Sequence, residues 1–266
     1  MSVRIQNNAM NQAKRHDEAK RASSARLASG QQINRASEGA ADLAAASKLK
    51  STARATAAAL SNANRGLALG QIADGAMSQI QELSFRLKEL AVSAASDTFS
   101  DADRALANTE YQEVIKAIDG IADRTRYSGT ALLNAVTTFD IQTGEDGATD
   151  TTTFITDDVT SATLGIVGDI TSKANAVAQQ TLIDTALDTL ATARSKAGSF
   201  MVGLESTISV NQVKIENLEG AISVFTEADL AKEATNLAMA DIKSQMAQAM
   251  ITKENQAASN VTGLVR

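Results

Sequence analysis

The chain has 266 residues, a formal net charge of -6, and no proline, tryptophan or cysteine. Evenly mixed charges of both signs argue against a nucleic-acid-binding surface. The lack of cysteine excludes disulfides and thiolate metal sites, and a single histidine, His16, leaves most metal and general-base chemistry without its usual residue. Because proline breaks helices, its absence permits very long ones. The composition predicts a mainly α-helical, elongated protein that binds no cofactor and is not an enzyme.

Two further absences bear on where the chain works. It contains no run of 18 apolar residues, and residues 1–25 are polar rather than basic and then apolar. We therefore expect no membrane insertion and no export by a cleaved signal sequence.

The first third of the sequence predicts a weak helix followed by a long one. Residues 1–34 carry few apolar positions, so we expect a helix there only with a partner. From residue 36 to about 96, apolar residues recur at steps of three and four, which is typical of a helix that packs along a seam. The pattern shifts between Gly66 and Gly70, which predicts a break in register and a bend. The later seam includes Leu83, Leu87 and Leu90.

A helix start signal follows at Ser100. A serine N-cap with Asp101 and Asp103 in the first turn places negative charge where the helix dipole favours it. The helix should run to about Arg126 and double back against the long helix before it.

The period then changes to that of strands. Phe139 and Ile141 alternate with polar residues, a glycine-containing turn follows, and residues 151–155 are β-prone, so a β-hairpin is predicted at about 136–156. We expect it to cap the end of the helical rod. The threonine-rich run from Thr149 to Thr163 should face solvent, either unmodified, which we favour, or glycosylated.

A second long helix is predicted from after Ser172 to about Phe225. Its apolar seam is held for more than five heptads and includes Leu204, Ile208, Ile215 and Leu218. Asn211 either fixes register inside this seam or lies at its edge, and the edge position is favoured. Arg194 is interpreted as a side chain that extends out to solvent. The two long helices should pair as an antiparallel rod, residues 36–226.

The last helix should begin after Thr226, where an acidic cap pattern ends the rod. With residues 1–35 it would form an inner terminal-helix domain, residues 1–35 and 227–266. Its apolar side chains have no partner in the rod, so we expect them to form a subunit interface that generates a helical polymer. These residues are Leu237, Ile242, Met246, Met250, Val261 and Leu264.

Several segments together resemble bacterial flagellins. Arg26-Leu27-Ala28-Ser29-Gly30 resembles the family's N-terminal signature, and Arg124 to Asn134 resembles a second conserved segment. Glu227 to Glu233 and the closing Gly263-Leu264-Val265-Arg266 match the C-terminal half. The resemblance covers nearly all of the chain outside the hairpin and implies a minimal flagellin without the variable outer domains.

This resemblance implies a filament subunit that self-assembles through its terminal helices and serves motility. It also implies secretion through the flagellar export apparatus with an export chaperone, location in a flagellum outside the cell or in the periplasm, and contacts with hook-associated and cap proteins. Arg86, Leu90 and Glu110 align with positions recognised by a Toll-like innate receptor, although we favour inter-subunit contact as their role. The alternative function is a hook-filament junction protein.

Overall fold

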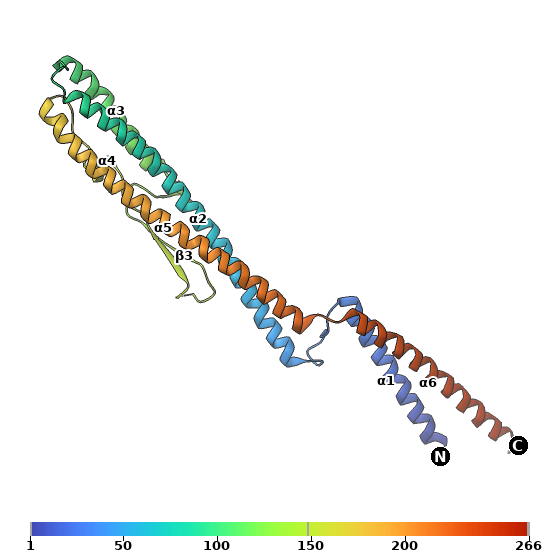
Figure 1. The fold of residues 1–266 in the computed structure, drawn as a ribbon. Coiled ribbons are helices and arrows are strands. Elements are labelled where there is room, and N and C mark those ends of the chain that lie inside the picture. Colours follow the sequence, from blue (N-terminus) through green and yellow to red (C-terminus); the bar gives the residue numbers. More distant parts are fainter. Residues whose placement is uncertain (1, 148, 265–266) are drawn as a thin grey trace. The chain divides into compact units, whose positions relative to one another are not determined.

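The computed structural model describes residues 2–147 and 149–264, with side chains for 10–147, 149–257 and 259–260. The fold is mainly α-helical with small antiparallel β elements (Figure 1), which confirms the predicted fold class. In chain order the elements are α1 (Ser2–Ser29), α2 (Ala40–Ala94), α3 (Asp101–Arg124), β1 (Arg126–Tyr127), β2 (Thr130–Ala131), β3 (Thr138–Gln142), β4 (Thr151–Ile155), α4 (Ser161–Leu164), α5 (Lys173–Thr226) and α6 (Leu230–Leu264).

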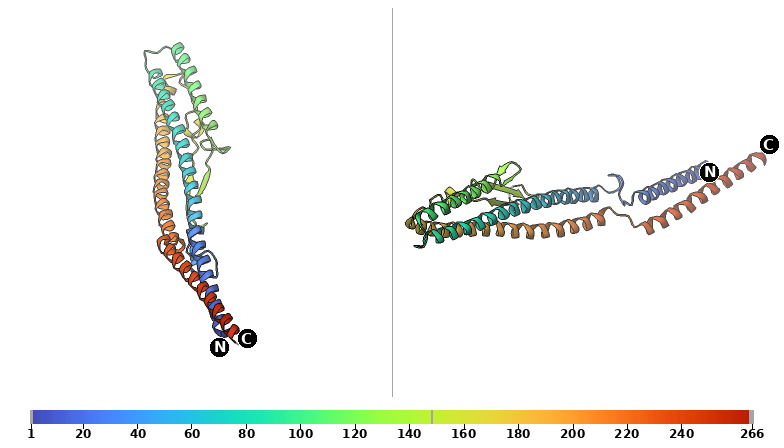
Figure 2. Two further views of the ribbon diagram at one scale, coloured as in Figure 1. Left: turned by 90° about the vertical axis from the view of Figure 1, so that its right-hand side faces the viewer. Right: turned by 90° about the horizontal axis from the view of Figure 1, so that it is seen from above.

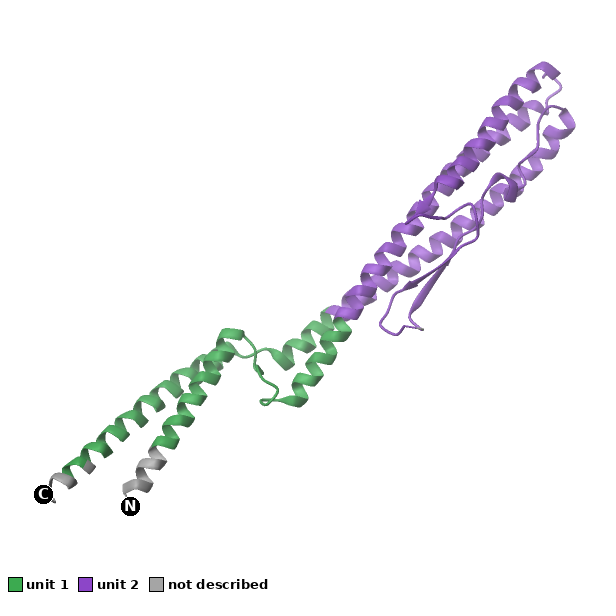
Figure 3. Cartoon of the chain, turned by 180° about the vertical axis from the view of Figure 1, so that it is seen from behind, with its two compact units in different colours: residues 1–53, 216–266 green, residues 54–215 purple. Residues whose placement is uncertain are grey.

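The chain divides into two compact units (Figure 3). Unit 1 comprises residues 1–53 and 216–266, and unit 2 comprises residues 54–215. The long helices α2 and α5 contribute to both units. The domain division at residues 35/36 and 226/227 stays a prediction.

In unit 2, α2 and α5 run antiparallel in one constant register. The Arg194 Nε lies 2.8 Å from the Asp74 carboxylate, and further along, Lys88 pairs with Asp184. Near the end of α2, the Gln180 amide donates to the Ala91 carbonyl at 3.3 Å. As the residue number rises along α2 it falls by nearly the same amount along α5, so the two helices stay in register.

The predicted register break in α2 is wrong. The buried positions of α2 keep steps of three and four without interruption, because Gly66 and Gly70 are themselves seam residues. A Cβ at Gly66 would lie 3.0 Å from a methyl of Leu204, and one at Gly70 would lie 2.8 Å from the Met201 Cγ. Because glycine has no side chain, the two helices approach closely here. A pattern that counts only apolar side chains omits both glycines and therefore indicates a shift in register that is not present. The continuous seam is Thr56, Ala59, Ala63, Gly66, Gly70, Ala73, Met77, Ile80, Ser84, Leu87, Ala91 and Ala94.

The predicted rod seam residues are not equally buried. Leu87 and Leu204 are fully buried, and Leu90 is nearly so. Leu83 and Ile208 are half-buried and pack against the hydrophobic core that these residues belong to. Ile215 and Leu218, nearer the C-terminal end of α5, are half-buried as well. Ala186, Ala193 and Phe200 form a second buried column on α5, and the residue after each of them is only half-buried. The buried stripe of α5 is wider than that of a helix with one helical partner, because the β3–β4 hairpin packs on α5 as well.

The turn from α2 into α3 is built as the sequence predicts at Ser100. Its hydroxyl accepts a hydrogen bond from the Asp103 amide at 3.2 Å, and the Asp103 carboxylate accepts one from the Ser100 amide at 3.1 Å, a complete capping box. The helix α3 then doubles back along α2, so that Arg86 on α2 meets Glu110 on α3 at 2.6 Å. It ends at Arg124, where Ser128 and Gly129 form the turn of the small β1–β2 hairpin with positive φ.

The larger hairpin forms where it is predicted, with Phe139 opposite Phe154 and Asp140 opposite Thr153. Its predicted position at the end of the rod is wrong, because it lies along the flank of α2 and α5 (Figure 1). A Cβ at Gly66 of α2 would lie 3.2 Å from the Ile141 Cγ1, and the Phe154 ring stacks on Phe200 of α5 with centroids 4.5 Å apart. The predicted exposure of the threonine-rich run is also wrong in part, because this run supplies core residues. They are Phe154, Thr156, Val159 and Ser161.

In unit 1, α1 and α6 lie side by side and antiparallel in both views of Figure 2. Arg26 pairs with Glu233 at 3.4 Å, and the Ser244 hydroxyl donates to Asp17 at 2.8 Å. The segments that lead into the pair are joined by backbone hydrogen bonds from Gln32 to Thr226 at 2.8 Å and from Ala228 to Gly30 at 2.9 Å. Gly30 has φ of 68°, a conformation that glycine adopts without strain.

Candidate subunit interfaces

The helix α6 presents two different surfaces. The surface toward α1 contains Glu233, Ala240 and Ser244, which are buried, and Leu237, which is half-buried. A second surface is formed by Met239, Ile242, Met246 and Met250, which recur at steps of three and four, and we call it the methionine face. All four side chains of the methionine face are between 52% and 63% exposed.

The predicted interface residues are thus divided between these two surfaces. Ile242, Met246 and Met250 belong to the exposed methionine face, whereas Leu237 packs toward α1 within the same chain. The side chains of Val261 and Leu264 lie outside the described residues. An exposed apolar stripe along one helix is typical of a surface that binds another helix.

The seam between α1 and α6 is polar, whereas the seam between α2 and α5 is mostly apolar. Its buried positions include Ser23, Glu233 and Ser244, and the Glu233 Oε2 and Arg26 Nε are buried without a hydrogen-bond partner in the described structure. The Lys20 ammonium is hydrogen-bonded to Asp241, which raises the pKa of Lys20. His16 is half-buried. Such a seam contributes little hydrophobic free energy to the pairing of the two helices.

Arg86, Leu90 and Glu110 lie together on one surface of unit 2. The Arg86 guanidinium donates to Glu110 at 2.6 and 2.8 Å and to Glu89 at 3.0 Å. These hydrogen bonds raise the pKa of Arg86, and the bond to Glu110 has the largest effect. Leu90 forms the floor of the groove between α2 and α3, and Leu106, which is 74% exposed, forms its rim. The three residues can therefore be contacted by one partner.

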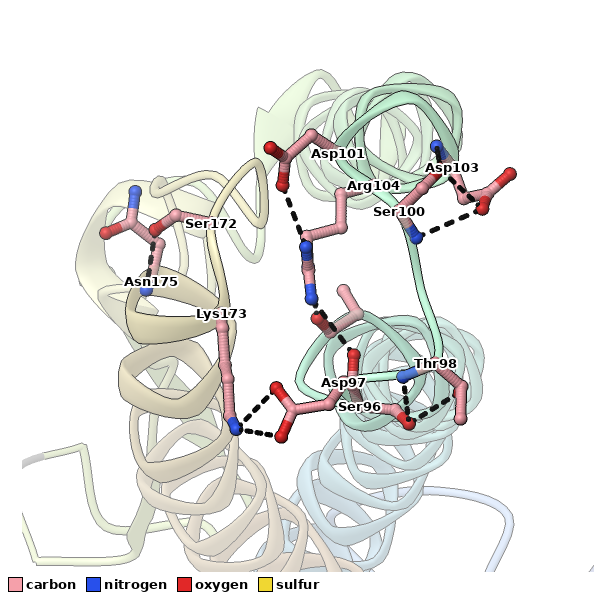
Figure 4. A network of polar contacts seen from close by, with 11 residues as sticks. Ser96, Asp97, Thr98, Ser100, Asp101, Asp103, Arg104, Ser172, Lys173 and Asn175 are labelled. Atoms are coloured by element: carbon pink, nitrogen blue, oxygen red, sulfur yellow. Dashed lines mark hydrogen bonds and ion pairs between the residues drawn. The ribbon is translucent and has the colours of Figure 1, made fainter.

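Two buried polar groups in unit 2 were not predicted in their observed roles. Arg104 is buried, and its guanidinium donates to the carbonyls of Ala94 and Ser96 and to Asp101 at 2.9, 3.0 and 2.9 Å (Figure 4). It thereby satisfies carbonyl groups at the end of α2. The favoured edge position for Asn211 is wrong, because Asn211 is buried and donates to the Thr143 carbonyl at 2.8 Å. The sequence signal for this buried role was the occurrence of a polar residue, Asn211, at a seam position of the heptad repeat.

Arg194 does more than extend to solvent. Its guanidinium also donates to the Gln81 amide oxygen at 2.7 Å, so it joins α5 to two residues of α2.

Within residues 2–147 and 149–264, no three acidic or histidine side chains are grouped so that they could hold a metal ion. No helix in that part of the chain is long and apolar enough to cross a bilayer.

These features define a mainly α-helical protein whose candidate functional surfaces are helix faces. Residues 2–138 match the model for the bacterial flagellin N-terminal helical region, and residues 180–265 match that for the C-terminal helical region. The chain belongs to the bacterial flagellin family.

Known relatives agree with this assignment. A flagellin from Halalkalibacterium halodurans is 32% identical over 91% of this chain and 90% of its own length. The crystal structure of Bacillus cereus flagellin matches 56% of this chain and 88% of its own with a TM-score of 0.52 and 26% identity. A hook-associated protein structure from Vibrio parahaemolyticus shares the fold, with a TM-score of 0.60 and 12% identity.

Proposed function

We propose that this chain is the structural subunit of a bacterial flagellar filament. The observation that carries the proposal is that both terminal regions match flagellin models, while a relative named flagellin aligns over 90% of its own length. The hook-filament junction protein stays the alternative. The similarity to a hook-associated protein rests on the fold alone, since the identity is only 12%.

The methionine face of α6 is the surface that we assign to polymerisation. Its four exposed apolar residues would be costly in water on a long helix, and burying each fully contributes about 1.5–3 kcal/mol. Methionine side chains adapt to irregular partner surfaces. If the matching surface on the next subunit is a different one, the contact is heterologous and repeats without closing, which produces a helical filament.

The terminal helices would be ordered mainly by assembly. The polar α1–α6 seam offers little apolar burial to offset the entropy of ordering two helices, so we expect both to be mobile in the monomer and fixed in the filament. This suits export of an unfolded chain through the flagellar secretion apparatus with a chaperone bound. Contacts with hook-associated and cap proteins belong to the same proposal. We assign Arg86, Leu90 and Glu110 to contact between subunits, with an innate receptor as the alternative partner.

Seeded polymerisation tests the filament assignment. Purified protein mixed with sheared filament fragments should elongate into long filaments visible by negative-stain electron microscopy. Short or absent polymers under conditions in which the protein stays folded would favour the junction protein instead.

A paired substitution tests the assigned interface. Met246→Glu with Met250→Glu places two charges on the methionine face, whereas Gln245→Glu with Gln248→Glu adds the same charge at exposed positions off that face. We expect the first variant to abolish sedimentable polymer and the second to retain it. Equal polymer from both variants would remove the methionine face from the interface.

A further inference from the structure

The strand β4 has an outer edge without a strand partner. The Thr143 amide donates to the Asp150 carbonyl and the Thr156 amide to the Thr137 carbonyl, each at 2.9 Å. In an antiparallel pair the hydrogen-bonded positions alternate, so the amides of Thr151, Thr153 and Ile155 point away from β3. All three residues are exposed, and Ile155 is 52% exposed. On the opposite side, Asn62 of α2 donates to the Gln142 carbonyl of β3 at 3.3 Å.

A groove runs between this edge and α5. Its β4 side is formed by residues 152–155, and the stacked rings of Phe154 and Phe200 form part of its wall. Its α5 side is formed mainly by small side chains or none, namely Ala191, Thr192, Ser195, Ser199 and Gly203. Two larger side chains of α5 also line it: Phe200, and Lys196, whose ammonium pairs with the Asp157 carboxylate at 2.9 Å.

The unpaired edge of β4 and the groove beside it together leave room for one more strand next to β4, above the surface of α5. A neighbouring strand would lie about 4.8 Å from β4, over the groove whose α5 side consists mainly of short side chains. Natural proteins usually cover or block an exposed strand edge because it is a template for pairing. Here β4 ends in the apolar, exposed Ile155 and carries no charged residue.

We propose that this groove binds an extended polypeptide segment, which adds to β4 as a third antiparallel strand. Main-chain hydrogen bonds to Thr151, Thr153 and Ile155 would hold the segment, and alternate β-branched residues would pack toward Phe154 and Phe200. Antiparallel pairing continues the pattern of the β3–β4 hairpin.

Given this direction, charge locates a basic residue of the segment. Phe154 lies against Phe200 and Asp157 against Lys196, so β4 runs antiparallel to α5 and Asp188 lies beyond the C-terminal end of β4. The exposed Asp188 carboxylate makes no hydrogen bond or ion pair with any described residue. An antiparallel segment begins at that end, so the ligand is a segment with a basic residue at its N-terminal end.

A peptide titration tests this. The probe is the synthetic peptide Lys-Thr-Val-Thr-Val-Thr, added to the full-length monomer labelled with 15N. We expect saturable shifts of the Thr151, Thr153 and Ile155 amides. Asp188→Asn should weaken binding about two- to fivefold, in line with an exposed ion pair.

Two tryptophan substitutions supply the matched control. Gly203 lines the groove, and no atom lies within 4 Å of the position that a Cβ would take there, so Gly203→Trp should fold and fill the groove. Val202 is the adjacent residue, 66% exposed and outside the groove, so Val202→Trp should bind as the original chain does. Equal binding by both variants, or no shifts at β4, would overturn the proposal. Protection of these amides that grows with protein concentration without peptide would also overturn it, since a second copy would then fill the groove.

Discussion

The Asn211 side-chain amide donates a 2.8 Å hydrogen bond to the backbone carbonyl of Thr143, within a seam that is otherwise mostly apolar. The bond joins α5 to the turn between β3 and β4, and Lys214 pairs with Glu145 of the same turn at 3.0 Å. The hairpin is therefore held to α5 by a buried polar contact at one end and by the Phe154–Phe200 stack nearer the other.

Asn211→Ala should destabilise the protein by about 1–3 kcal/mol, because the Thr143 carbonyl would be left buried without its donor. Urea unfolding followed by circular dichroism measures this change. The control is Asn217→Ala, an exposed position on the same helix, which should change stability by less than about 0.5 kcal/mol. A similar effect of both substitutions would contradict the role assigned to Asn211.

Leu204→Ala should cost about 2–5 kcal/mol, because Leu204 is fully buried against α2 and its loss leaves a cavity. Thermal unfolding of the monomer measures the loss. Leu106→Ala removes the same atoms from a side chain that is 74% exposed and should have little effect. Unchanged stability of the Leu204 variant would refute the close packing of α2 on α5.

Two glycines of α2 should respond in opposite directions. Gly70→Val should destabilise by about 1–3 kcal/mol, because a Cβ there would lie 2.8 Å from Met201. Gly75→Ala should stabilise by about 0.5–1 kcal/mol, since nothing lies within 4 Å of that site and alanine favours the helix. Chemical denaturation of the two variants side by side gives the comparison, and a stabilising Gly70→Val would show that the helices do not approach closely.

The tip where α2, α3 and α5 meet should lose stability in acid. The hydrogen bond from Lys173, and then its charge, lower the pKa of Asp97, and hydrogen bonds from Ser100 lower the pKa of Asp103. A carboxyl whose pKa is lower in the folded state contributes stability above its unfolded pKa of about 3.9 and loses it as the pH falls through the folded value. NMR titration of the carboxyl carbons should place both midpoints below that of an unfolded aspartate. Asp97→Asn should reduce the acid sensitivity of unfolding, and an unchanged pH profile would argue against the Lys173 pair.

The sequence predicted local elements well because their signals are local. Ser100 and Asp103 lie three residues apart, and Phe139 and Ile141 alternate within one strand, so each pattern can be read without knowing the partner. The flagellin resemblance and the mainly helical fold could also be predicted from local motifs and composition. Long-range relations were harder. Arg104 reads as a surface residue in α3 until the end of α2 is placed beside it.

The interface prediction illustrates the same limit. Leu237, Ile242 and Met246 all follow helical spacing, but which of them faces α1 depends on the partner and not on α6 alone. Gly66 and Gly70 were excluded from the seam because apolar patterns do not count glycine, although a close helix contact requires it.

The notch formed by Gly66 and Gly70 limits sliding between the two long helices. Leu204 and Met201 occupy it, and moving α5 by one helical turn would bring one of them against the Cβ of Ala63 or Ala73. Axial shear along the pair must therefore first separate the helices. Such a stop opposes axial sliding of the two helices without any covalent cross-link, which suits a chain that has no cysteine.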